Sequence, residues 1–403
     1  MQNSSKSLSF LFVFAITSLY SSMTCLRPSA AIAQNAVSKP VQAAMQQPVA
    51  KAPELMMLAN APAASTSSPA AAPPEQKINF KTAALGGNSV IAFLKKLREY
   101  QLSWAQFPLK RPDFIKGIYL TNGTAATMKS LTHFVDKSKK HGINTMVIDT
   151  QGKMLTPEQM SYIKGSGIYP VARIVVFDLG LKTKFPDTKH IDKIMTTVER
   201  SAKAGFREIQ LDYIRYADHR ELQRLPLKFK YDQIRGVLGR ARKLTDSLGV
   251  ELGADVFGRI TLNENDHIGQ RLEVFGEFVH ALYPMVYPSH YYGDPEKIAN
   301  PYGTVKEGVE NSKERIPKTR IVPWIQGFGM KIKESGLTLP QYVLKQFFAV
   351  DDANGDGYVV WNARNDYSAT WKALEEYDRR APERKKQQQQ KVAQAGAAAA
   401  EKK

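Results

Sequence analysis

The run EIQLDYIRY at residues 208–216 has the apolar core of a buried strand but carries several polar side chains. A strand of a parallel sheet that is buried on both faces is nearly continuously hydrophobic. Here an amide, a carboxylate and a guanidinium interrupt the apolar run. Such groups are costly inside a protein unless they are paired or reach water. We therefore expect a short strand whose C-terminal end, with Asp212 and Arg215, opens onto a wet, functional surface.

Seven other apolar or β-branched runs resemble this strand, and amphipathic segments separate them. The predicted strands are 117–122, 145–150, 169–177, 208–215, 251–257, 281–288, 320–328 and 357–364, and the helical patterns are 128–141, 189–204, 231–247, 269–279, 304–315 and 339–351. Alternating strands and helices of this number and total length predict a (β/α)8 barrel. A doubly wound open sheet is the alternative, but it usually has a glycine-rich first turn, and none follows Asn122.

The two ends of the chain differ in composition from the middle. Residues 1–33 have the basic start, short apolar core and small-residue cleavage site of a secretory signal peptide. An Ala- and Pro-rich linker at 34–77 and a bracing segment at 78–112 would precede the barrel at 113–378, and a basic, Gln- and Ala-rich disordered tail would occupy 379–403. We expect a protein exported to the periplasm or the extracellular space.

Cysteine usage and charge agree with export. The one cysteine, Cys25, would leave with the signal peptide, although a lipid anchor on Cys25 is the alternative. Of the net charge of +18, +6 lies in residues 379–403, +3 in residues 1–78 and +9 in the middle. This excess of positive charge suits an anionic glycan or peripheral association with the cell envelope, and ordinary solvated lysines explain it equally well.

Three carboxylates are expected at the mouth of the barrel, where barrel enzymes carry their chemistry. Asp149 ends the second predicted strand, and the fourth and fifth carry Asp212 and Asp255 in their C-terminal halves. Glycoside cleavage needs one carboxylic acid that protonates the leaving oxygen and a second carboxylate that acts as nucleophile or base. We assign Asp212 as nucleophile or base, Asp255 as acid, and Asp149 as auxiliary or alternative acid.

Other polar and aromatic residues are predicted at the same end, where they would bind substrate. Aromatic rings would stack on sugar faces, and the two arginines would either hold the acids ionised or clamp an anionic group of the substrate. The predicted substrate-binding residues are Arg173, Arg215, Tyr287, His290, Tyr291, Trp324, Gln326, Trp361 and Asn362.

Several motifs together resemble the family of bacterial putative glycoside hydrolase domains, relatives of the α-amylase-like barrels. The motifs are 117–121, 169–177, 208–215, 254–258, 283–290, 323–326 and 361–363. The resemblance spans about 113–375 and implies a barrel that acts on an oligo- or polysaccharide. Two departures from the wider amylase pattern argue against copying its roles: Gln210 stands where that pattern has Arg, and Asp255 where it has Glu.

No cofactor and no metal are expected. Asp352, Asn354 and Asp356 are spaced like the start of a calcium loop, but position twelve is Ala363 rather than Glu, and a tight turn explains the same residues. A glycan-binding module on a degenerate barrel is the alternative to a hydrolase. Nucleic-acid binding through the basic tail is the weakest reading, because export separates the chain from most nucleic acid.

Overall fold

The computed structural model describes residues 109–400, all of which belong to the compact unit Lys81–Lys403. The predicted signal peptide, the linker and most of the bracing segment lie outside the described residues. The strands are β1 (Ile115–Leu120), β2 (Thr145–Asp149), β3 (Tyr169–Val175), β4 (Glu208–Asp212), β5 (Glu251–Phe257), β6 (Ala281–Met285), β7 (Arg320–Ile321), β8 (Trp324–Gln326) and β9 (Gly357–Trp361).

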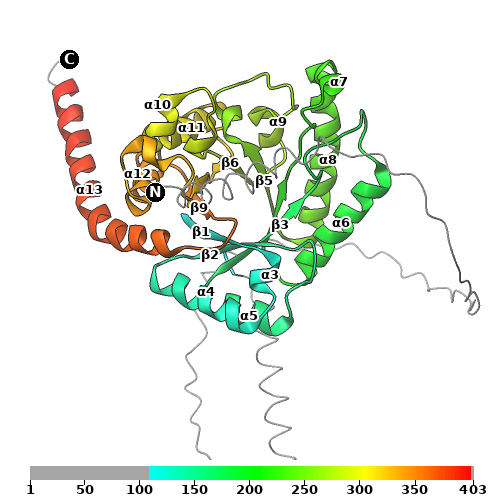
Figure 1. Ribbon diagram of the computed structural model, residues 1–403, viewed down its shortest axis with the longest axis horizontal. Helices are drawn as coiled ribbons and strands as arrows, with labels where there is room; N and C mark the ends of the chain where they lie inside the picture. Colours follow the sequence, from blue (N-terminus) through cyan, green and yellow to red (C-terminus); the bar gives the residue numbers. More distant parts are fainter. Residues whose placement is uncertain (1–108, 401–403) are drawn as a thin grey trace, which may run out of the picture. The chain divides into compact units, whose positions relative to one another are not determined.

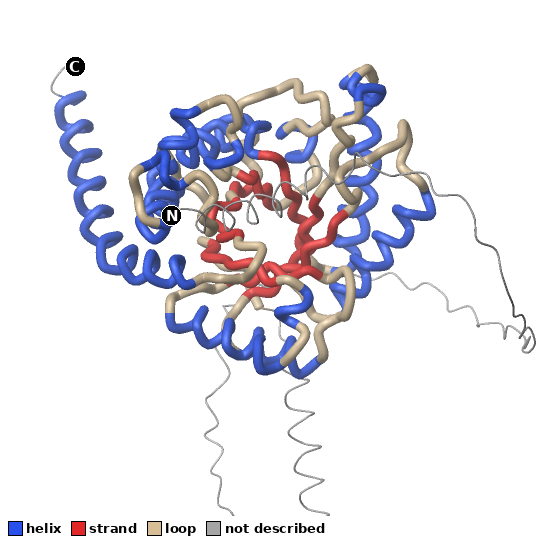
Figure 2. Tube along the Cα trace, viewed as in Figure 1, coloured by secondary structure: helices blue, strands red, loops and turns tan. Residues whose placement is uncertain are grey.

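These strands form a closed, all-parallel barrel, as the sequence predicts. Their order is β5-β4-β3-β2-β1-β9-β8-β6-β7, and pairing of β5 with β6 closes the ring. β7 and β8 both pair with β6 and together fill the seventh position of an eight-stranded barrel. The break between them includes Pro323, which has no N–H to donate to the ladder. Figure 2 shows the strands as a ring inside the helices.

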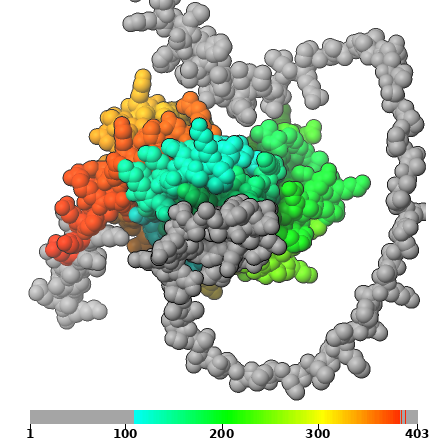
Figure 3. Space-filling view, turned by 90° about the horizontal axis from the view of Figure 1, so that it is seen from below, coloured from blue at the N-terminus to red at the C-terminus, as the bar shows by residue number. Residues whose placement is uncertain are grey.

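Helices surround this ring (Figure 1). The larger ones are α4 (Met128–Lys140), α5 (Pro157–Gly165), α6 (Thr188–Lys203), α8 (Leu227–Leu248), α11 (Pro301–Arg315), α12 (Leu339–Asp352) and α13 (Ser368–Ala400), and the short ones are α3 (Asn122–Ala125), α7 (Arg220–Gln223), α9 (Leu272–Gly276) and α10 (Pro295–Ala299). Single 3-10 turns are η1 (Gly258–Thr261), η2 (Pro288–His290) and η3 (Ile332–Ser335). Seen from below, α4 and α5 form one face (Figure 3). No helix in residues 109–400 is long and apolar enough to cross a membrane.

Helix ends follow the expected capping chemistry. Gly249 ends α8 with φ of 64°, in the left-handed region where glycine avoids a steric penalty. Thr156 and Gln159 form a capping box at the start of α5, a helix that the periodicity of the sequence does not predict. α13 continues to Ala400, through residues that the composition assigns to a tail.

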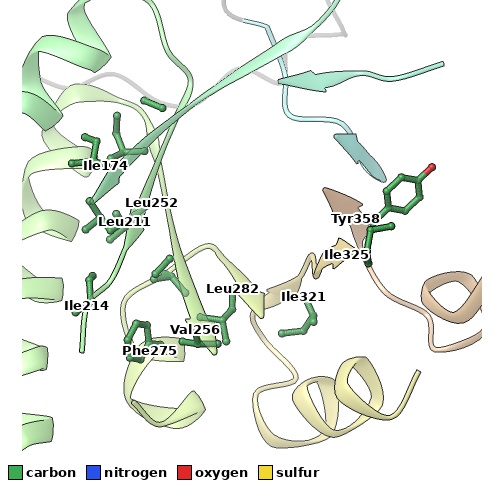
Figure 4. Packing of buried hydrophobic residues seen from close by; sticks show 14 of the residues in the cluster. Ile174, Leu211, Ile214, Leu252, Val256, Phe275, Leu282, Ile321, Ile325 and Tyr358 are labelled. Atoms are coloured by element: carbon green, nitrogen blue, oxygen red, sulfur yellow. The ribbon is translucent and has the colours of Figure 1, made fainter. Parts of the chain in front are cut away.

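The alternation of β4 explains its unusual sequence. Ile209 and Leu211 are fully buried between the strands and the helices, and Figure 4 shows Leu211 beside Ile174 and Leu252 in that layer. The alternate positions, Glu208, Gln210 and Asp212, point into the barrel, since successive side chains of a strand face opposite sides. The charges therefore belong to the inner face of the strand, at three successive levels of the barrel interior.

The lowest of these levels is a buried ion-pair cluster at the N-terminal ends of the strands. Arg111 lies 2.6 Å from Glu251 and 3.5 Å from the fully buried Glu208. Tyr283 donates a hydrogen bond of 2.6 Å to Glu208. Arg111 belongs to the predicted bracing segment, so the last residues of that segment are bound to the bottom of the barrel.

Candidate active site

Arg173 joins two of the three predicted acids at the C-terminal ends of the strands. Its Nη1 donates to Asp149 at 2.6 Å, and its Nε and Nη2 both donate to Oδ2 of Asp212, at 3.0 and 2.5 Å. Burial opposes the charge on Arg173, but Asp212, Asp149 and Asp255 raise its pKa well above the ordinary value. One guanidinium thus serves a cluster of three carboxylates.

Asp212 ends β4 in a backbone conformation that supports its side chain. The next residue, Tyr213, has φ of 56°, an uncommon conformation for a residue with a Cβ. Its backbone N–H donates to Oδ1 of Asp212 at 2.6 Å. Both oxygens of Asp212 therefore accept hydrogen bonds, and the side chain is almost fully buried.

Asp255 is in a different environment, although it lies close to Asp212. It is fully buried; its Oδ1 accepts from Gln210 at 2.6 Å and from Trp324 at 2.8 Å, whereas its Oδ2 has no hydrogen-bond partner in residues 109–400. Burial, and next the charge on Asp212, raise the pKa of Asp255 well above its usual value. Burial thus favours the protonated form of Asp255, which suits it to act as the acid.

The separation of these two carboxyls is limited by their shared neighbour. The Nε of Arg173 lies 3.0 Å from Oδ2 of Asp212 and 3.9 Å from Oδ2 of Asp255. The two oxygens are consequently no more than about 7 Å apart, an upper limit that leaves out most of the roughly 6.5 to 9.5 Å range of inverting glycosidases.

Asp149 is the most accessible of the three acids and is held by a tyrosine that the sequence analysis did not select. Its side chain is 25% exposed. Tyr119 on β1 donates to its Oδ2 at 2.5 Å and stacks on Trp361 with ring centroids 4.1 Å apart. The guanidinium of Arg173 lies 5.2 Å from the Trp361 ring. Tyr119 occupies one of the alternate positions of its strand whose side chains point into the barrel. This alternation is the one signal in the sequence that could have identified it.

Tyr287, His290 and Tyr291 follow β6, but they occupy different places. Burial and the adjacent Asp255 and Asp212 carboxylates raise the pKa of Tyr287, which faces the acids. The exposed His290 has its ring 5.3 Å from that of Tyr287. The hydroxyl of Tyr291 is buried, next to the position that a side chain on Gly258 would occupy.

Three predicted substrate-binding residues have their polar groups engaged by the protein itself. Gln326 binds the backbone of Ser289, Phe328 and Met330, and Asn362 binds that of Gly327, Arg364 and Asp366. Arg215 lies beyond the end of β4, pairs with Asp218 at 3.5 Å and packs over Phe257 at 4.7 Å. No contact joins Arg215 to the three acids.

The residues at the calcium-like spacing also have protein partners. Asp352 accepts from Tyr302 at 2.7 Å and pairs with Arg384. Asp356 pairs with Lys313 at 3.1 Å and accepts from the backbone N–H of Ile321. These contacts favour a tight turn over a calcium loop. Within 109–400, no group of three or more His, Cys, Asp or Glu side chains is arranged to hold a metal ion.

Comparison with known families supports the resemblance seen in the sequence. Residues 192–367 match the family described as "Putative glycosyl hydrolase domain". The match includes Asp212 and Asp255, whereas Asp149 and Arg173 precede it. A comparison with curated proteins found no match.

Solved structures of similar fold are glycoside hydrolases. The endo-β-1,4-mannanase from Thermotoga petrophila is 12% identical, with a TM-score of 0.52 over 68% of this chain and 78% of that one. A second mannanase structure, from strain RKU-1, is 12% identical with a TM-score of 0.50 over 66% and 99%. The PgaB glycoside hydrolase domain from Bordetella bronchiseptica is 10% identical with a TM-score of 0.48 over 64% and 97%. At these identities the two mannanase structures show the shared barrel fold, and the family match supports a glycoside hydrolase.

Proposed function

We propose that this protein is exported and hydrolyses glycosidic bonds of an envelope or extracellular polysaccharide by a two-carboxylate mechanism. The observation that carries the proposal is that Asp255, whose pKa is raised by burial and by Asp212, lies beside Asp212, which accepts hydrogen bonds from Arg173 and Tyr213. A carboxyl with a raised pKa beside a second carboxyl is a usual mark of a paired acid and base.

In the proposed reaction Asp255 donates its proton to the glycosidic oxygen of the leaving sugar. Asp212 either attacks the anomeric carbon or takes a proton from the water that attacks it. Water supplies the hydroxyl group and the proton that complete hydrolysis. Arg173 holds Asp212 by two hydrogen bonds, and Asp149 is an auxiliary or alternative acid because it is the carboxylate most open to solvent.

Export rests on the sequence of residues 1–33, and a periplasmic or extracellular location follows from it. Peripheral association with the cell envelope would bring the basic chain to an anionic surface. Fractionation of cells that express the full chain tests this part separately. Cleavage after residue 33 and recovery outside the cytoplasm are expected, and an uncleaved cytoplasmic chain would contradict export.

A glycan-binding module is the second candidate, and one observation favours it. Both oxygens of Asp212 are occupied by Arg173 and Tyr213, and Asp149 is held by the same arginine. Carboxylates that are locked onto an arginine are suited to shaping a binding surface. In this alternative the barrel holds the glycan without cutting it.

One experiment separates the two candidates. Purified protein is incubated with a panel of envelope and matrix polysaccharides, and new reducing ends are measured for wild type, Asp212→Asn, Asp255→Asn and Asp149→Asn. Loss of an acid or base should lower the rate by about 100-fold or more. Asp192→Asn, which changes a pair with Arg240 on the outer helices, should retain activity. Turnover retained in Asp212→Asn overturns the assignment, and binding without new reducing ends favours the module.

A further inference from the structure

The exposed large apolar side chains of the described residues share one end of the barrel. Met128, Leu179, Phe185, Leu262 and Tyr292 are each at least 38% exposed. Leu179, Phe185, Leu262 and Tyr292 lie in connections between a strand and the next helix, and Met128 begins α4, so all five are on the side of the C-terminal ends of the strands. Exposed apolar groups that are concentrated in one region mark a binding surface. Phe185 and Tyr292 are the aromatic members and the most exposed.

Tyr292 begins an aromatic path that leads down to the acids. Its ring is 68% exposed and lies 6.1 Å from that of His290. The His290 ring is in turn 5.3 Å from the ring of Tyr287, and Phe328 lies 5.6 Å from Tyr287 on the same wall. Lys331 places its Nζ 4.5 Å from the centre of the Tyr292 ring.

Phe185 forms a second aromatic and lysine pair, after β3. Its side chain is 56% exposed, and its ring meets the edge of Phe229 at 5.4 Å. The Nζ of Lys184 lies 5.4 Å from the Phe185 ring and 5.5 Å from the Phe229 ring. Lys184 and Lys331 form no ion pair with any residue of 109–400, so their charges are free for a ligand.

The two pairs flank the strands that carry two of the acids. β3 and β6 are separated by β4 and β5, which carry Asp212 and Asp255. A ligand that touches both pairs would therefore pass the C-terminal ends of these two strands. Aromatic rings stack on the apolar faces of sugars, and the adjacent ammonium groups favour anionic substituents.

We propose that Tyr292 with Lys331 and Phe185 with Lys184 bind an extended polysaccharide that carries carboxylate or sulfate groups, and that this binding places an internal bond of the chain over the acids. The inference rests on the proposed function for its cleavage step, but not for binding. It deepens that function by naming the substrate as an acidic polymer that is cut internally.

Affinity electrophoresis of the full chain tests the binding. The gels contain polygalacturonate, carboxymethyl cellulose or dextran sulfate, and the matched neutral gels contain methyl-esterified polygalacturonate, hydroxyethyl cellulose or dextran. At least one acidic polymer should retard the wild type more than its neutral counterpart. Tyr292→Ala and Phe185→Ala should each weaken that affinity by about 3- to 30-fold.

The lysine variants and a control variant test whether binding is specific for the acidic polymer. Lys331→Gln and Lys184→Gln should lose affinity for the acidic polymer and keep whatever affinity exists for the neutral one. Lys139→Gln removes an exposed lysine near the C-terminal end of α4, away from the mouth of the barrel, and should bind as wild type does. Equal retardation by acidic and neutral gels, or unchanged affinity in the four rim variants, overturns the proposal.

Cleavage is measured independently of binding. If the wild type degrades the polymer, its viscosity should fall well before reducing ends accumulate, and single sugars released from chain ends would contradict internal cutting. Rim variants that lose affinity in a protein with no hydrolase activity would uphold the binding inference and reject the proposed function. If the wild type hydrolyses the polymer and the rim variants do so at the same rate, the proposed function is upheld and the binding inference is rejected.

Discussion

Arg173 donates two hydrogen bonds to a single oxygen of Asp212, from Nε at 3.0 Å and from Nη2 at 2.5 Å. Its remaining nitrogen, Nη1, binds Asp149. The pairing lies at the mouth of the barrel, with the arginine side chain only 10% exposed. Three carboxylates therefore depend on one buried positive charge, and both stability and chemistry should respond to its loss.

Replacement of Arg173 by Met should destabilise the protein by about 3–5 kcal/mol at neutral pH, because it leaves buried carboxylates unpaired. The deficit should shrink as the pH is lowered, since protonation of the acids removes their repulsion. Urea unfolding at several pH values measures both effects. The control is Arg235→Gln, which breaks an exposed pair with Glu277 and should cost no more than about 1 kcal/mol. A deficit that does not vary with pH would contradict the shared-charge interpretation.

Asp255→Asn should separate stability from activity. The amide keeps an oxygen for Trp324 and Gln210, so packing is retained while the dissociable proton is removed. Because the folded pKa of Asp255 is raised above its unfolded value near 3.8, the wild type is most stable below that value and loses stability as the pH rises through the folded pKa. Asp255→Asn has no carboxyl at this position and should not lose stability as the pH rises. Its stability relative to wild type should therefore increase with pH, while hydrolysis is lost.

Denaturant unfolding of both proteins from pH 4 to pH 9 checks this expectation. Stability curves that stay parallel across the range would show that Asp255 ionises normally in the folded protein. In that case Asp149 would become the better candidate for the acid.

The sequence predicts the barrel well because its strands are buried on both faces and several helices end at glycine. It misses α5, because this short helix buries Gln159, Ser161 and Lys164 and so has no clear apolar stripe. It predicts one seventh strand, whereas β7 and β8 are separated at Pro323.

The site is predicted less completely than the fold. Asp149, Asp212 and Asp255 could be selected because each lies at or near the end of a strand. The hydrogen bonds of Arg173 to two acids, of Tyr119 to Asp149 and of Gln210 to Asp255 depend on how side chains cross the barrel interior. The spacing of these residues in the sequence does not predict such contacts across the barrel interior.

Tyr119→Phe should show whether the position of Asp149 matters. The change removes the hydrogen bond to Asp149 and keeps the ring that stacks on Trp361. Loss of a hydrogen bond to a charged group should cost about 1.5–3 kcal/mol in free energy of unfolding. If Asp149 takes part in catalysis, the pH dependence of kcat should also shift. Tyr162→Phe removes a similar bond to Asp136 on the outer helices and should leave the pH profile unchanged.

Arg111→Met should weaken the fold from the opposite end of the barrel and leave the chemistry intact. The substitution leaves Glu208 fully buried without its cation, and burial already raises the pKa of that carboxyl. A cost of about 3–5 kcal/mol is expected, and Glu208→Gln in the same protein should recover most of it by removing the unpaired charge. Lys110→Met, at an adjacent pair that is 88% exposed on both sides, should change nothing measurable. Thermal and urea unfolding give the stabilities, and kcat of the folded fraction should match wild type. If the double variant is no more stable than Arg111→Met alone, Arg111 acts by packing the bracing segment rather than by neutralising Glu208.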